Sequence, residues 1–261
     1  MKLNFVDQAA ENSADRPAVI LMHGMFGSLS NLGGLARALL PDYRVIAVDL
    51  RNHGDSPHDP QMSIPLMAED IVELMDDLGL PEAHLVGHSL GGKIGMQVAQ
   101  LWPRRLCSLV VADIAPVHYP QSNSHVVDAL TKLHSSQIQS RKAADQIMAD
   151  YIQDKPTRGF ILKNLQPDNE GGYRLKLNVT SIVANYSDSL VEAPDGPPFY
   201  GPCLFVKGEL SAYIQDKHRP LIKSLFPASE LQVIAGAGHW LHAEKPEQFN
   251  SLVISFLNAN G

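Results

Sequence analysis

The chain has 261 residues, of which 44% are hydrophobic and 19% charged, and its formal net charge at pH 7 is −7. This length suits one α/β domain, or a core domain with a smaller attachment, and the composition argues against a disordered chain or a fibre. The negative charge gives no basic footprint for a nucleic acid partner.

The polar N-terminus lacks an apolar stretch of signal-peptide length, and no run approaches 18 apolar residues. We therefore expect a cytoplasmic protein with no insertion into a membrane. Cys107 and Cys203 each stand at the start of an apolar run, and we expect both to be buried, reduced thiols.

Six short apolar runs are spaced so that helices fit between them. Because they are nearly continuous rather than alternating, they are typical of strands buried on both faces of a parallel sheet. The runs are 18–24, 43–50, 83–89, 107–115, 203–208 and 231–238. A helical stripe that includes Met67, Ile71 and Leu74 lies between two of them, and Pro246 opens a last helix. The pattern predicts an α/β fold with a mostly parallel central sheet flanked by helices, whose functional groups lie at the carboxyl ends of the strands.

The interval 116–200 interrupts this alternation. It holds no comparable strand, and a structureless loop of that length would be unusual in a compact domain. Three amphipathic helical patterns occur in it instead, at 126–133, 144–152 and 179–186. We expect residues 1–115 and 201–261 to form the core, and residues 116–200 to form an inserted helical cap, or lid.

A candidate nucleophile lies in VGHSLGG (86–92), a G-x-S-x-G pattern between a predicted strand and a helical run. Its glycines permit a sharp turn that exposes the Ser89 hydroxyl at the carboxyl edge of the sheet. Since a serine hydroxyl is a poor nucleophile without a base, a histidine must lie at another strand end. His239, after the glycines of IAGAG, is that candidate. We expect its rival His242 to support the loop by hydrogen bonding, and His88 to point into the core.

Attack by serine on a carbonyl also requires donors for the developing oxyanion. The glycines of HGMFGS (23–28) let backbone N–H groups point into a site, and this loop precedes the nucleophile in the chain, as in α/β-hydrolases. The amides of Met25 and Leu90 are the predicted donors.

The segments HGMFGS, DLRNHGDS, GHSLGGK, DIAPVHY and GAGHWLHAEKPE resemble the α/β-hydrolase superfamily, and in particular the YbfF-type bacterial esterases. The likeness runs from about Leu21 to the C-terminus and is densest outside the predicted cap. It implies the α/β-hydrolase fold and hydrolysis of acyl esters or thioesters through an acyl-enzyme, with no metal or other cofactor.

The acidic member of the site is less evident than the serine and the histidine. In most α/β-hydrolases it follows the penultimate strand in a G-x-x-D arrangement, and counting from Gly208 that place falls on Ser211, which carries no charge. Asp113 ends the strand after the nucleophile's strand, where the resemblance places the acid of YbfF-type enzymes. Glu209 is the alternative, and Ser211 is expected to assist the pair of Asp113 and His239 by hydrogen bonding.

The predicted function is a serine carboxylesterase or acyl thioesterase acting on short- to medium-chain acyl substrates. Phe26, Tyr119 and Trp240 are expected to line its acyl pocket, His53 to border the pocket, and Lys93 to be a solvated or packing residue. A carbon–carbon bond hydrolase, a perhydrolase and a catalytically silent binding module remain alternatives. Substrate identity and oligomeric state stay open at this point.

Overall fold

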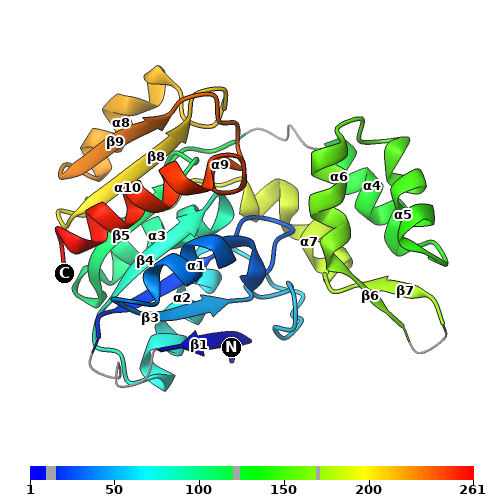
Figure 1. Cartoon of the computed structure of the whole chain (residues 1–261), viewed down its shortest axis with the longest axis horizontal. Helices are drawn as coiled ribbons and strands as arrows, with labels where there is room; N and C mark the ends of the chain where they lie inside the picture. Colours follow the sequence, from blue (N-terminus) through cyan, green and yellow to red (C-terminus); the bar gives the residue numbers. More distant parts are fainter. Residues whose placement is uncertain (10–15, 120–123, 169–170) are drawn as a thin grey trace.

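All six predicted apolar runs form strands of the central sheet. The computed structural model describes residues 1–9, 16–119, 124–168 and 171–261. The six strands are β2 (Ala18–Met22), β3 (Arg44–Val48), β4 (Ala83–His88), β5 (Leu106–Ala112), β8 (Cys203–Gly208) and β9 (Ser229–Ile234). They pair in parallel in the order β3-β2-β4-β5-β8-β9, so their carboxyl ends meet at one edge of the sheet (Figure 1). The prediction of a mostly parallel sheet is confirmed.

A seventh strand, β1 (Phe5–Gln8), pairs antiparallel with β3 at the edge of the sheet. This strand was not predicted from the sequence, because all four of its residues are exposed. An exposed edge strand needs no continuous apolar run, which was the signal used to find the others.

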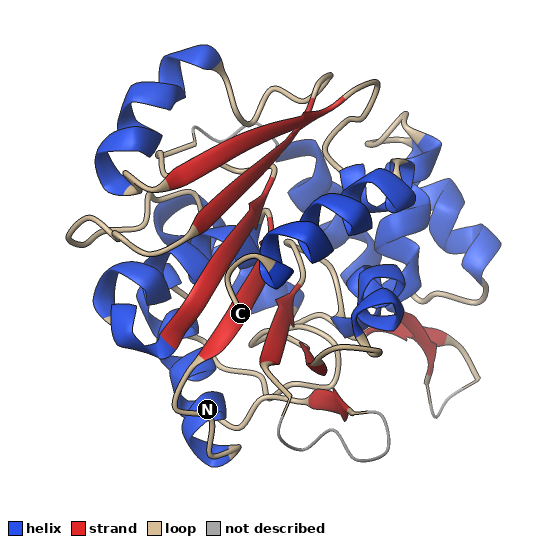
Figure 2. Ribbon diagram, turned by 60° about the vertical axis from the view of Figure 1, so that its left-hand side comes forward, coloured by secondary structure: helices blue, strands red, loops and turns tan. Residues whose placement is uncertain are grey.

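Helices cover both faces of this sheet, as Figure 2 shows. One apolar cluster joins α2 (Ile64–Asp77), α3 (Leu90–Leu101) and α8 (Arg219–Leu225) to one face. A second cluster joins α1 (Gly33–Leu39) and α10 (Pro246–Asn258) to the other, and the short α9 (Leu241–Glu244) precedes α10. Single turns of 3-10 helix cover Leu29–Leu32, Pro103–Arg105, Leu162–Asn164 and Asp216–His218.

The interval between β5 and β8 contains the helices that its amphipathic patterns predict. They are α4 (Ser124–His134), α5 (Arg141–Ala149) and α7 (Val179–Asn185), and a π-helical turn, Tyr186–Leu190, follows α7. A fourth helix, α6 (Lys155–Ile161), was not predicted. These helices lie together beside the sheet in Figure 1. A two-stranded hairpin, β6 (Leu165–Pro167) with β7 (Tyr173–Leu175), also lies there. The sequence analysis missed the hairpin because three-residue strands show no period. The cap limits of 116–200 stay a proposal.

The two cysteines differ in exposure. Cys203 is buried, as predicted, and burial raises the pKa of its thiol well above the usual value. Cys107 is only half-buried, so the prediction for this residue was wrong: it stands at the amino end of β5, where the strand leaves the core. Within the ranges that the structure describes, the helices are too short or too polar to cross a membrane.

Candidate active site

Ser89 lies on a strained turn between β4 and α3. Its φ of 51° and ψ of −113° are unfavourable for a residue with a Cβ, and its N–H donates to the Ala112 carbonyl at 2.9 Å. The turn is possible because residues 87 and 91 are glycines and have no Cβ. A Cβ on Gly87 would lie 2.1 Å from the Gly91 oxygen, and one on Gly91 would lie 2.4 Å from the Met22 oxygen, so any other residue would clash. The two glycines therefore let α3 begin close against the sheet, and Ser89 stands at the carboxyl end of β4.

Asp113 and His239 meet at the same edge of the sheet. Asp113 directly follows β5 with a φ of 53°, and its side chain is completely buried. Its Oδ2 accepts from His239 Nδ1 at 2.8 Å and from the Ser211 hydroxyl, and its Oδ1 accepts from the Gly208 N–H at 3.1 Å. The structure thus brings together Asp113, Ser211 and His239, from three loops far apart in the sequence.

Glu209, the alternative acid, has a different environment. Its side chain is exposed, and its Oε2 accepts from the Gly236 N–H at 2.8 Å. It ties the loop after β8 to the loop after β9. No described contact joins it to His239.

Met25 and Leu90, the predicted sources of the oxyanion donors, lie near Ser89. Both residues line a cavity that reaches Ser89, and no described atom accepts a hydrogen bond from either amide. The neighbouring Phe26 N–H, in contrast, donates to His53 Nε2 at 3.1 Å and is unavailable to a ligand. His53 is completely buried and does not border the cavities, so the expectation for this residue was wrong.

The two other histidines near His239 are held by packing. His88 is buried, and its Nε2 lies 2.8 Å from the His239 carbonyl oxygen, which places the His239 loop against β4. Burial lowers the pKa of His88 well below the usual value. The ring of His242 packs 4.5 Å from that of His88, and its Nδ1 has no hydrogen-bond partner among the described residues, so the expected support of the loop by hydrogen bonding does not come from this nitrogen. Burial lowers the pKa of His242 to about 4.

Two cavities meet at Ser89. The larger, of about 240 Å³, is lined by His239 and Trp240 and by residues of the segment between β5 and β8, here called the insertion, among them Val126 and Phe160. The smaller, of about 80 Å³, is lined by Leu90, Tyr119 and Ile114. Phe26 lines both. The three residues predicted to form one pocket therefore divide between two, because the insertion approaches Ser89 from two sides.

Tyr213 is a site residue that the sequence analysis did not name. Its ring stacks on the His239 imidazole, with centroids 4.1 Å apart and planes 25° apart, and it lines both cavities. Its backbone carbonyl accepts from the Tyr119 hydroxyl. An aromatic residue two positions after Ser211 was the available signal, but only the fold shows that this loop lies over His239.

Lys93 is buried, which agrees with a packing role and not with a solvated one. Its ammonium donates to the carbonyls of Val191 at 2.8 Å and Leu190 at 3.4 Å and also to that of Glu192, and it lies 5.1 Å from the centre of the Tyr119 ring. Burial lowers the pKa of Lys93 to about 7, and Glu192 partly opposes this. The contacts link the helix behind Ser89 to the end of the insertion.

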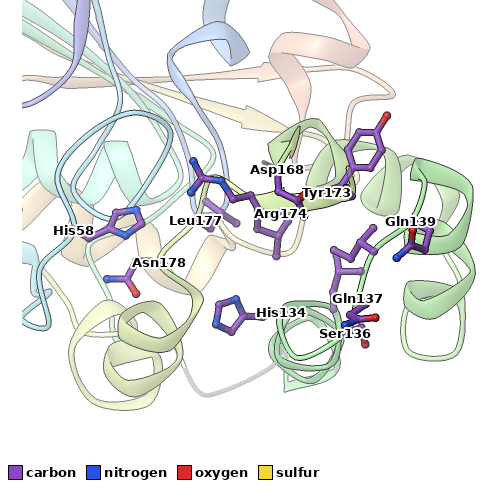
Figure 3. A pocket seen from close by; sticks show the side chains of 14 residues that line it. His58, His134, Ser136, Gln137, Gln139, Asp168, Tyr173, Arg174, Leu177 and Asn178 are labelled. Carbon is purple, nitrogen blue, oxygen red and sulfur yellow. Dashed lines mark hydrogen bonds between the residues drawn. The ribbon is translucent and has the colours of Figure 1, made fainter. Parts of the chain in front are cut away.

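A larger cavity, of about 550 Å³, lies elsewhere and has none of the predicted site residues in its lining. Figure 3 shows it between the β6–β7 hairpin, the end of α4 and core residue His58, with His134 and Arg174 facing it. Most of its labelled side chains are polar, and they come from the end of α4, from strand β7 and from the neighbouring loops. The predicted site residues Ser89 and His239 line the smaller cavities instead.

Comparison with known proteins gives consistent results. The family described as "alpha/beta hydrolase fold" matches residues 17–246. "Esterase YbfF" of Escherichia coli strain K12 is 38% identical, over 99% of this chain and 100% of its own length. "sn-1-specific diacylglycerol lipase ABHD11" of Mus musculus is 37% identical, over 95% of this chain and 83% of its own length. A solved structure, "Marine microorganism esterase", superposes with a TM-score of 0.92 at 36% identity, covering 98% of this chain and 99% of that one.

Proposed function

The chain belongs to the α/β-hydrolase fold family and, within it, to the YbfF-type esterases, and on that premise we propose that it is a serine carboxylesterase working through an acyl-enzyme. The observation that supports this most directly is the 2.8 Å contact between His239 Nδ1 and Asp113, beside a cavity that Ser89 also lines. We assign Ser89 as nucleophile, His239 as base and Asp113 as the acid.

The proposed reaction follows from the hydrogen bonds. An ionised carboxylate only accepts, so Asp113 holds the proton of His239 on Nδ1 and leaves Nε2 free to take the Ser89 proton. Ser89 then attacks the acyl carbonyl, and the amides of Met25 and Leu90 bind the oxyanion. His239 returns the proton to the leaving alcohol, which departs. Water, deprotonated by the same histidine, then releases the acid and frees Ser89.

The two cavities suggest how the substrate divides. The leaving oxygen must receive its proton from His239, and only the larger cavity is lined by His239. We therefore assign the leaving group to the larger cavity and the acyl chain to the smaller. Its 80 Å³ equals the volume of about three water molecules at ~30 Å³ each, which favours short acyl chains.

A panel of p-nitrophenyl esters with acyl chains of increasing length tests this assignment. We expect kcat/KM to be highest for the shortest chains and to fall steeply once the chain outgrows the smaller cavity. A diacylglycerol and acyl-CoA thioesters belong in the panel, the first because a relative is named for that substrate. A maximum at long chains would contradict the cavity assignment but not the mechanism.

Covalent labelling tests the mechanism itself. A fluorophosphonate should label the folded wild-type protein, and Ser89→Ala should abolish both labelling and ester hydrolysis. Absence of labelling in folded wild-type protein would favour the catalytically silent alternative. A cytoplasmic location and independence from cofactors stay predictions, and activity after dialysis against a chelator checks the second.

A further inference from the structure

Phe26 has an unfavourable backbone conformation that its neighbours must maintain. Its φ is 61°, in the left-handed region, which is unfavourable for a bulky residue. The residue is anchored on both sides. Its N–H donates to the buried His53 of the core, and its carbonyl accepts from the side chain of Asn164 at 2.7 Å.

Asn164 belongs to the insertion, at the end of the 3-10 turn between α6 and β6. It is 4% exposed, and its Nδ2 donates both to Phe26 and to the Ile161 carbonyl at 3.0 Å. Since both acceptors are carbonyl oxygens, the amide nitrogen must face them. One N–H therefore fixes the side chain to its own turn, and the other reaches the core loop.

Two peptide groups, linked by a hydrogen bond, connect this contact to the Met25 amide. The Phe26 carbonyl and the Gly27 N–H belong to one peptide plane, and Gly27 N–H donates to the Gly24 carbonyl at 3.0 Å. The Gly24 carbonyl and the Met25 N–H belong to the second plane. Each hydrogen bond in such a chain both orients and polarises the following group.

We infer that Asn164 is a positioning residue of the oxyanion hole, acting from the insertion through this hydrogen-bonded chain on the Met25 N–H. It does not touch the substrate. The inference rests on the proposed function, and it makes the quality of the oxyanion site depend on how the insertion is docked. Removal of a complete donor typically costs 10²–10³-fold in kcat, so loss of its orienting partner should cost less.

The test compares Asn164→Leu, which keeps the approximate shape but has no N–H, with Asn178→Ala. Asn178 also joins the insertion to the core, through its Nδ2 to Asn52 Oδ1 at 2.9 Å, but has no described contact with the 23–28 loop. We expect Asn164→Leu to lower kcat by about 10-fold or more with KM little changed. The affinity for a trifluoromethyl ketone, whose adduct places an oxyanion in the hole, should fall by a similar factor. Asn178→Ala should lower thermal stability and leave the ratio of ketone affinity to KM unchanged.

Three results would overturn the inference. Equal kcat and equal ketone affinity in Asn164→Leu and wild type would refute the positioning role alone. If Asn178→Ala lowered the ratio of ketone affinity to KM as much as Asn164→Leu does, any loosening of the insertion from the core would have this effect, and Asn164 would have no special role. If folded wild type neither hydrolyses esters nor binds the ketone, both the proposed function and this inference fail. Where the leucine variant does not fold, Asn164→Ala serves the same comparison.

Discussion

At the scale of single residues, three hydrogen bonds converge on the Asp113 carboxylate. The buried carboxylate receives the Gly208 N–H, the Ser211 hydroxyl and His239 Nδ1. Ser211 follows β8 while Asp113 follows β5, and these strands are neighbours in the sheet. A carboxylate on either strand end can therefore reach the histidine, and the residue at the other end supplies a hydrogen bond.

Asp113→Asn should lower kcat by about 10⁴-fold, because an amide can donate to Nδ1 and so favours the wrong tautomer of His239. The measurement is steady-state hydrolysis of a p-nitrophenyl ester. Glu209→Gln is the matched control, since Glu209 is an exposed carboxylate that contacts Gly236, and it should retain almost full activity. The reverse pattern would mean that Glu209 is the acid.

Ser211→Ala removes one of the three donors to Asp113 and leaves the other two. A lost hydrogen bond to a charged group corresponds to about 1.5–3 kcal/mol, so we expect a loss of activity of about 10- to 100-fold. Pre-steady-state measurement of acylation would locate the loss in the chemical step. A decrease as large as that of Asp113→Asn would make Ser211 a full member of the site.

At the scale of elements, α3 does more than support Ser89. Three of its residues are buried and donate hydrogen bonds to backbone carbonyls at the end of the insertion. They are Lys93, Gln97 and Gln100. The spacing of four and then three residues puts these side chains in line. The helix that begins at the nucleophile therefore also anchors the returning chain.

Lys93→Met should reduce the free energy of unfolding by about 2 kcal/mol, because it leaves buried carbonyls without a donor. Urea unfolding at neutral pH measures the change. Lys142→Met, at an exposed position of α5, is the control and should stay within about 0.5 kcal/mol of wild type. Equal stability of Lys93→Met and wild type would mean that water replaces the ammonium at these carbonyls.

At the scale of the whole molecule, two buried histidines make stability depend on pH. Burial lowers the pKa of His23 to about 4 and that of His53 to about 3, from the usual 6.5. Each Nε2 accepts a backbone N–H, from Leu50 and from Phe26 respectively. A protonated imidazole has no acceptor, so acid must break both bonds.

Because the pKa of each histidine is lower in the folded state, the unfolded chain binds more protons below pH 6.5. Stability should therefore be complete above about pH 6.5 and fall as the pH drops toward 4 for His23 and toward 3 for His53. The loss should reach about 3 kcal/mol for His23 and about 4–5 kcal/mol for His53, because the pKa of His53 is lowered further. Urea unfolding at several pH values measures it.

A non-titrating variant provides the comparison for this pH dependence. His53→Gln should be less stable at pH 7 but should lose less stability on acidification. His134→Gln, at an exposed position of α4, should keep the wild-type slope. Identical slopes for His53→Gln and wild type would contradict the prediction.

The parallel sheet can be predicted from the sequence alone, since continuous apolar runs are required wherever a strand is covered on both faces. The sequence also singled out Ser89 and His239, because a nucleophile turn and a loop that folds back over the sheet both need glycines at particular places. These requirements concern neighbouring residues, so they can be seen in short segments of the sequence.

Which side chains meet is known only from the three-dimensional fold. It placed Asp113 with Ser211 through the pairing of β5 with β8, and it divided the expected pocket between two cavities. It also brought Tyr213 onto His239 and Asn164 onto Phe26, across 26 and 138 positions of the chain respectively. Contacts between distant loops depend on how strands are ordered and how the insertion docks, and neither leaves a period or a motif in the sequence.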